Sequence, residues 1–223
     1  MLIALMLAST VGITERVEVQ DFTKFRHRGG SDIKILVDPS APERVVIELT
    51  GDEESIEKLE IASEKGELSI GPKRDSNMRR FPDIRFKVRS LEEIASAGSG
   101  DIRVAGLDGD MVFQTAGSGD LQATGDIDEC EISVAGSSDV SVSGISGDQT
   151  KVRIAGSGDV TVSGKSRKVL IEIAGSGDVD ARGLTAEKAQ VQIAGSGNAS
   201  VCATDSIKRQ VRGSGDVDEA CID

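Results

Sequence analysis

The chain has 223 residues, a formal net charge of −12, no Trp, no Tyr and only five Phe. Nucleic-acid binding requires Lys and Arg against phosphates and aromatic rings against bases, so this composition argues against a nucleic-acid partner. The charge is concentrated in residues 97–223, which hold eleven Lys and Arg against twenty Asp and Glu. We interpret it as a solvated surface, with affinity for cations or a basic partner as the alternative.

The first ten residues, Met1–Thr10, are almost entirely apolar. We interpret residues 1–14 as a secretory signal, shortened because its usual positive start is missing. A buried first strand is the alternative. The apolar run is too short to span a bilayer, so we expect no transmembrane segment.

Residues 15–96 are predicted to be a β-rich region that caps one end of a larger stack. Asp52 to Leu59 is expected to form one or two helical turns, and Glu64-Lys65-Gly66-Glu67 a hairpin turn. The segment Arg28–Ile33 resembles a degenerate copy of the repeat described next. The basic loop around Arg79 and Arg80 is expected to be solvated. Alternation of apolar and polar residues predicts strands at Val17–Val19, Asp32–Val37, Val45–Leu49, Glu67–Ile70 and Ile84–Val88.

Residues 97–223 contain seven copies of the phrase Ala-Gly-Ser-Gly-Asp, with small variations. The copies are separated by 19, 19, 20, 19, 20 and 18 residues. A fixed period of this size indicates one structural unit stacked on copies of itself. The copies begin at Ala97, Ala116, Ala135, Ala155, Ala174, Ala194 and Arg212.

Each repeat has alternating aliphatic residues on both sides of the glycine-rich phrase, which predicts a strand, a Gly-Ser-Gly turn, a second strand and a looser polar corner such as Gly164–Arg167. Parallel stacking of such units gives an all-β fold, a single-stranded parallel β-helix. Parallel crossovers favour the right-handed sense. A β-propeller is the weaker alternative, because two repeats per blade leave the ring unclosed. Arg209 and Glu219 stand at inward positions and mark the end of the stack.

The aspartates of the turns have two interpretations. They can accept backbone hydrogen bonds within the stack, or they can form a calcium-binding ladder as glycine-rich β-rolls do. The period here is about twice that of a calcium roll, and Asn198 interrupts the carboxylate column, so we favour the structural role. The weak calcium candidates are Asp101, Asp120, Asp139, Asp159, Asp178 and Asp216.

Cysteine and histidine are too scarce for a disulfide framework or a histidine-rich metal site. Cys202 and Cys221 lie one repeat apart, so stacking would permit a disulfide between them, and Cys130 would be left over. The single histidine, His27, lies between two arginines and is expected to be exposed. We predict neither a catalytic site nor a cofactor.

Several segments carry a resemblance to a known family: Phe22–Ile35, the strand Glu67–Ile70, and the run Ile94–Val104 that leads into repeated Gly-Ser-Gly-Asp. Together they resemble the "putative auto-transporter adhesin, head GIN domain" family. The resemblance covers nearly the whole chain from about Val17. It implies a β-helical protein exported by a Gram-negative bacterium, located in the periplasm, on the cell surface or in the medium. A cytoplasmic location is expected instead if the N-terminus is no signal.

These observations favour a non-catalytic envelope or surface protein, an adhesin-like scaffold or interaction module. Its partner would be a protein or polysaccharide of the cell envelope. A polysaccharide-binding or polysaccharide-cleaving β-helix is the alternative, and cleavage would need two suitably spaced carboxylates. The densest acidic corners are Asp108-Gly109-Asp110 and Asp126-Ile127-Asp128-Glu129. The sequence leaves the oligomeric state open.

Overall fold

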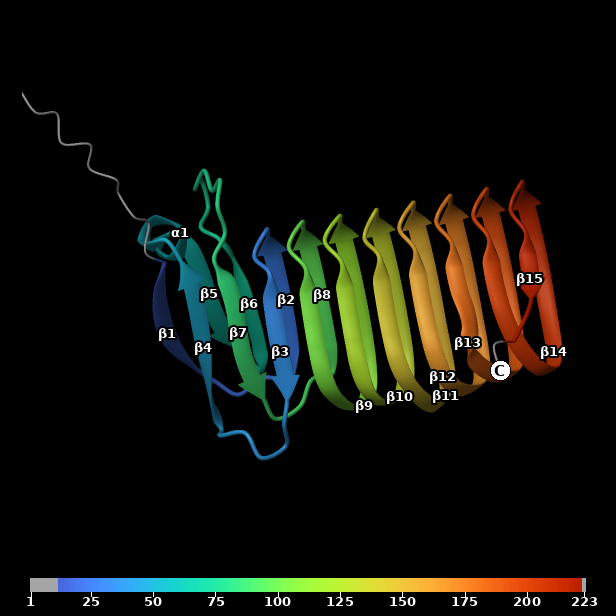
Figure 1. Cartoon of the computed structure of the whole chain (residues 1–223), viewed down its shortest axis with the longest axis horizontal. Coiled ribbons are helices and arrows are strands. Elements are labelled where there is room, and N and C mark those ends of the chain that lie inside the picture. Colours follow the sequence, from blue (N-terminus) through green and yellow to red (C-terminus); the bar gives the residue numbers. More distant parts are fainter. Residues whose placement is uncertain (1–11, 222–223) are drawn as a thin grey trace, which may run out of the picture.

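A computed structural model describes residues 12–221 as one long β-helix with a capping region at its N-terminal end (Figure 1). The expected all-β class and the parallel stacking of the repeats are confirmed. The expected signal segment falls mainly on residues 1–11, which lie outside the described residues, while Ile13 and Thr14 belong to the first strand.

The capping region contains short strands and one short helix. The helix α1 (Glu53–Glu57) begins at Asp52, whose carboxylate accepts the N–H of Ser55 at 2.9 Å. The five strands predicted in this region are confirmed, as is the strand β8 that the repeat pattern predicts before Ala97, and two further strands, β2 and β5, were not predicted. The strands are β1 (Ile13–Gln20), β2 (Lys24–Gly29), β3 (Ile33–Val37), β4 (Arg44–Gly51), β5 (Leu59–Glu64), β6 (Glu67–Pro72), β7 (Asp83–Val88) and β8 (Glu93–Gly98).

The repeats form longer strands than the sequence predicts. Each strand runs from one glycine-rich turn to the next without a break, because the corners keep their hydrogen bonds to neighbouring coils and absorb the bend as shifts of register. The loose polar corner predicted at Gly164–Arg167 is therefore wrong, since these residues lie within a strand. The strands are β9 (Ile102–Gly117), β10 (Leu121–Gly136), β11 (Val140–Gly156), β12 (Val160–Gly175), β13 (Val179–Gly195), β14 (Ala199–Gly213) and β15 (Val217–Glu219).

The first coil of the stack is formed by β2 and β3. Strand β2 pairs in parallel with β8, and β3 pairs in parallel with β9, so Gly29 is opposite Gly98 and Ile33 is opposite Ile102. On its other side this coil contacts β6 and β7. A coil from the start of the chain is thus enclosed by two later ones. The antiparallel strands β1 and β5 complete the cap.

The core is a continuous bore filled by aliphatic side chains. One coil contributes six inward positions, two of which come from the corner. Three phenylalanines pack together in the core near the cap, where the ring centroids of Phe22 and Phe25 lie 5.6 and 5.3 Å from that of Phe86 in edge-to-face contacts. The inward residues of β9 are Ile102, Val104, Leu107, Met111, Phe113 and Thr115.

Candidate functional site

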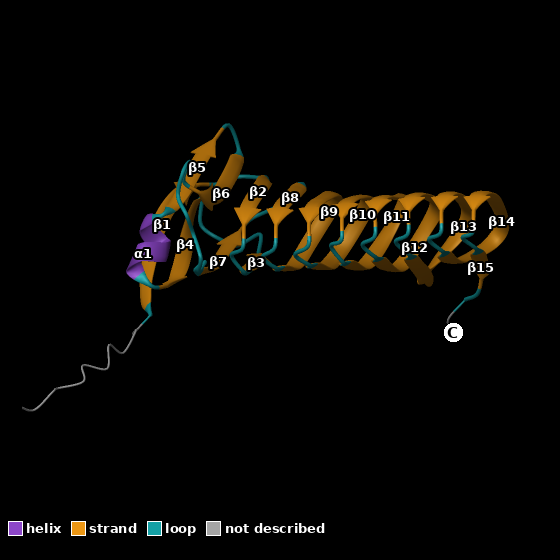
Figure 2. Ribbon diagram, turned by 90° about the horizontal axis from the view of Figure 1, so that it is seen from above, coloured by secondary structure: helices purple, strands orange, loops and turns teal. Residues whose placement is uncertain are grey.

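The glycine-rich turns form one row along the rod (Figure 2). The first glycine of each phrase has a backbone angle that favours glycine, such as φ +132° at Gly136. The second glycine serves close packing instead, because a Cβ at Gly158 would overlap the carbonyl oxygen of Ser138 in the preceding coil. The turns are therefore built around contacts between coils.

The turn aspartates form a hydrogen-bonded ladder. The backbone N–H of each residue in the column donates to the side-chain oxygen of the column residue one coil earlier. The N–H of Asp120 reaches Asp101 Oδ1 at 3.1 Å, and that of Asp178 reaches Asp159 Oδ1 at 2.8 Å. Asn198 continues the ladder, since its amide oxygen accepts the N–H of Asp216 at 3.0 Å. Asp32 of the first coil starts it by accepting the N–H of Asp101.

This ladder gives every calcium candidate a structural task. One oxygen of Asp101, Asp120, Asp139, Asp159 and Asp178 is occupied by the next coil. Asp216, the last member, donates into the ladder through its N–H. Within residues 12–221, no three His, Cys, Asp or Glu side chains converge in an arrangement that could hold a metal ion.

Two of the cysteines form a disulfide, and the third is a free thiol. The structure joins Cys202 and Cys221 by a disulfide across a sequence separation of 19 residues. The bond ties the end of the described chain to the last full coil. Cys130 is a free thiol inside the bore, where burial raises its pKa to about 12.

The histidine is the main error of the sequence analysis. His27 is only 2% exposed, because the alternation along β2 turns both arginine neighbours outward and the imidazole into the bore. Its Nδ1 lies 3.4 Å from Ser96 Oγ, and its Nε2 has no hydrogen-bond partner among the described residues. Burial lowers its pKa to about 4, partly opposed by Asp32.

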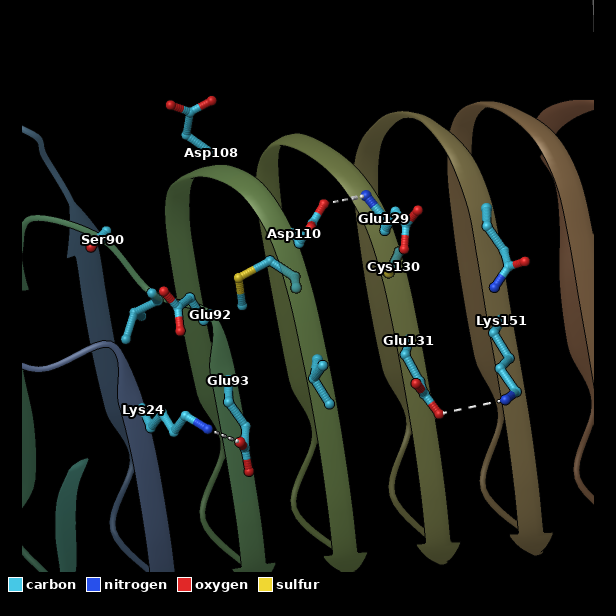
Figure 3. Close-up of a pocket in the computed structure, with 14 residues that line it drawn as sticks. Lys24, Ser90, Glu92, Glu93, Asp108, Asp110, Glu129, Cys130, Glu131 and Lys151 are labelled. Atoms are coloured by element: carbon cyan, nitrogen blue, oxygen red, sulfur yellow. Dashed lines mark hydrogen bonds and ion pairs between the residues drawn. The ribbon is translucent and has the colours of Figure 1, made fainter. Parts of the chain in front are cut away.

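An acidic groove of about 660 Å³ lies along the corners of the first coils (Figure 3). It unites Asp108, Asp110 and Glu129 from the two acidic corners with Glu93 and Glu131. Most of these carboxylates are engaged. Asp110 accepts the N–H of Glu129 at 3.1 Å, Lys24 lies 3.4 Å from Glu93, and Lys151 lies 3.9 Å from Glu131.

A second surface, which we call the alanine face, runs along the side of the rod. The alanine that precedes each glycine turn points outward, and Ala135, Ala155, Ala174 and Ala194 form the floor of an open groove of about 530 Å³. A neighbouring hollow continues it towards the cap past Ala116 and Ala97. The outward direction of these alanines follows from the alternation of the strands, a signal that the sequence analysis did not use.

Polar side chains border the alanine face. Arg153 donates to Glu172 at 2.9 Å and to Glu131 at 2.6 Å, and the hydrogen bond to Glu172 raises the pKa of the guanidinium. Gln192 and Gln210 continue this border over the next coils. The face thus offers small apolar contacts beside amide and guanidinium donors.

In the described part of the chain, no helix has the length and apolar character needed to cross a membrane.

Three solved structures share this fold over almost their whole length. A "putative lipid binding protein" from Parabacteroides distasonis has 24% identity and a TM-score of 0.78, with 93% of this chain and 96% of that chain covered. A "putative adhesin" from the same species has 18% identity and a TM-score of 0.78, with coverages of 95% and 98%. A "putative adhesin" from Parabacteroides merdae has 17% identity and a TM-score of 0.75, with coverages of 93% and 95%.

No protein of curated function matches the sequence. A family match covers residues 21–221, which is almost the entire described chain and includes every repeat and the cap except β1. The chain belongs to the family described as "Putative auto-transporter adhesin, head GIN domain".

Proposed function

We propose that this protein is an exported, non-catalytic module that acts as an adhesin-like rod at the cell envelope. The ladder of turn aspartates carries the proposal, because it commits the most regular set of carboxylates to holding the coils together rather than to chemistry. A uniform stack of this kind provides a rigid support for long side surfaces.

Two further observations support the proposal. The family is named for adhesins. The Cys202–Cys221 disulfide suits an oxidising compartment outside the cytoplasm.

We place the partner, an envelope protein or polysaccharide, on the alanine face. Its floor spans several coils and its border presents Arg153, Gln192 and Gln210, which can donate hydrogen bonds to an extended chain. The absence of Trp and Tyr from the sequence means that a sugar would be recognised here by hydrogen bonds and small apolar contacts rather than by stacking.

The test fills the groove without disturbing the fold. Arginine already occupies the alanine position at Arg212, so Ala155→Arg and Ala174→Arg are expected to fold normally. Fluorescent beads coated with the full chain are applied to immobilised envelope proteins and polysaccharides. We expect the double variant to lose adhesion, and the control Ser141→Arg, on a different face of the same coils, to retain it.

The outcome that contradicts the proposal is turnover. If the wild-type protein releases products from a polysaccharide, and Asp110→Asn or Glu129→Gln in the acidic groove abolishes the release, the protein is an enzyme. Adhesion that is unchanged in the double arginine variant would remove the alanine face from the proposal.

A further inference from the structure

Strands β4, β7 and β3 lie side by side in the sheet (Figure 1). A patch of basic and apolar side chains lies on the outer face of these three strands. It surrounds a shallow hollow of about 490 Å³. Leu36 and Val46 are each 39% exposed there, two of only four large hydrophobic side chains exposed to this degree in residues 12–221. We call this surface the basic patch, and define it by Lys34, Leu36, Val46, Arg85 and Lys87.

Two neighbouring pairs of cations face each other across the strands of the basic patch. In the parallel register Lys34 stands opposite Arg85 on one side and Arg103 on the other. Like charges directly opposite each other in a sheet destabilise it. Across residues 12–221, no carboxylate lies within ion-pair distance of Lys34, Arg85 or Lys87. No ion pair of Lys34 or Arg85 within the described residues offsets these two contacts between like charges.

The nearby acids are engaged elsewhere. Glu48 lies opposite Arg85 in the register but its carboxylate accepts two hydrogen bonds from Arg16, at 3.1 and 2.8 Å. Asp38 accepts hydrogen bonds from the backbone N–H and the hydroxyl of Ser40, which lower its pKa, and the nearby charge of Lys87 lowers it further without forming an ion pair. The patch is therefore a local positive surface on a chain with a net charge of −12.

We propose that the basic patch docks on the surface of a lipid bilayer that carries anionic headgroups. Long cationic side chains around exposed aliphatic ones match such a surface, because the cations reach the headgroups while the aliphatic groups enter the interface. This activity is independent of the partner proposed for the alanine face.

The structure disfavours two other occupants. Strands β4, β7 and β3 each have a neighbour on both sides, which leaves little free strand edge for an extended peptide to add to. A second copy of the chain would need an acidic surface with large exposed aliphatic groups. Outside the patch, the described residues expose only Ile13 and Val211 in this way, at opposite ends of the sheet order.

The experiment measures co-sedimentation of the full chain with vesicles. One set contains equal parts of phosphatidylglycerol and phosphatidylcholine, and the other contains phosphatidylcholine alone. We expect binding to the anionic vesicles at least about tenfold stronger than to the neutral ones, and weaker binding as salt is raised.

Two variants test the patch itself. Lys34→Glu with Arg85→Glu should weaken binding to anionic vesicles by at least about tenfold. Leu36→Ser with Val46→Ser keeps the charge and should also weaken binding. Lys165→Glu with Lys168→Glu is the matched control, since it makes the same change of net charge on an exposed part of β12 and should bind like the wild type. Circular dichroism confirms that each variant is folded.

Three results would overturn the proposal. The first is equal binding to neutral and anionic vesicles, and the second is an equal loss in the Lys165/Lys168 control. The third is a wild-type protein that binds neither kind of vesicle but binds an immobilised acidic peptide, which would assign the patch to a protein partner.

Discussion

At the scale of single residues, the turn aspartates show how one side chain is used repeatedly for the same purpose. Asp139 receives the N–H of Asp159 at 3.1 Å, and Asn198 performs the same task for Asp216 with an uncharged oxygen. The required feature is thus an acceptor oxygen and not a negative charge. This distinction separates a structural ladder from a cation site.

We predict that Asp139→Asn leaves the stability of the protein nearly unchanged, whereas Asp139→Ala lowers it by about 1–2 kcal/mol, because the N–H of Asp159 then loses its acceptor. Urea unfolding measures both values.

We also predict that millimolar Ca²⁺ leaves the melting temperature of the wild type unchanged. A large rise in the melting temperature with Ca²⁺, absent in Asp139→Asn, would restore the calcium interpretation.

His27 makes the stability of the cap depend on pH. The pKa of the folded state is about 4, below the ordinary value of 6.5, so the unfolded chain binds more protons between these pH values. Stability is therefore expected to fall as the pH is lowered through this window, by about 2 kcal/mol at pH 5. The variant His27→Leu should lack this loss.

Urea unfolding of both proteins at neutral pH and at pH 5 isolates the histidine, because the carboxylates titrate equally in the two. A pH dependence that is the same in the variant and the wild type would show that His27 does not cause it.

At the scale of elements, the two ends of the β-helix are closed differently. The N-terminal end carries antiparallel strands, whereas at the other end β15 pairs with only three residues of β14. Arg209 and Glu219 are in register with the buried Val191 and Val201, but both are more than half exposed at this end and lie 3.9 Å apart. The Cys202–Cys221 disulfide fastens this short strand across the end of the bore.

We predict that the disulfide stabilises the C-terminal end of the stack. Closing a loop of this length contributes about 3 kcal/mol in the chain-entropy account. Cys221→Ser, or reduction of the wild type, should make β15 sensitive to protease and lower the melting temperature by several degrees. Cys130→Ala is the control, since Ala189 occupies the same column, and it should keep the response to reductant.

At the scale of the whole molecule, each coil contacts mainly its two neighbours, so stability is expected to vary along the rod. The second half of β14 is mostly exposed, while β11 is enclosed by β10 and β12. We predict that backbone amides of β14 exchange with deuterium at least about tenfold faster than those of β11. Uniform protection from β9 to β14 would mean that the rod opens as one unit.

The sequence predicted the stack because Gly-Ser-Gly-Asp recurs where the geometry of the turn demands it. It did not reveal the inward column of Met111, Cys130 and Thr150, since these side chains share a position but little chemistry. His27 was misjudged because its charged neighbours conceal the alternation.

Surface patches were harder to predict from the sequence than the columns of equivalent residues that stack in successive coils. Lys34, Arg85 and Arg103 are far apart in the chain, and only the pairing of β7, β3 and β9 places them side by side. The alanine face could have been predicted more readily from the sequence, because its alanines occupy the same position in every repeat. The local sequence pattern thus determines what each coil presents, and the topology of the cap determines which surfaces meet.

The enclosed coil of β2 and β3 has a consequence for biogenesis. Both of its flanks are supplied by segments synthesised later, β6 and β7 on one side and β8 and β9 on the other. During synthesis or export this coil emerges first and must wait for both. Once it is enclosed, it offers a template on which every later turn can be wound in order, so a fragment beginning at Ala97 would lack the seed for its own assembly.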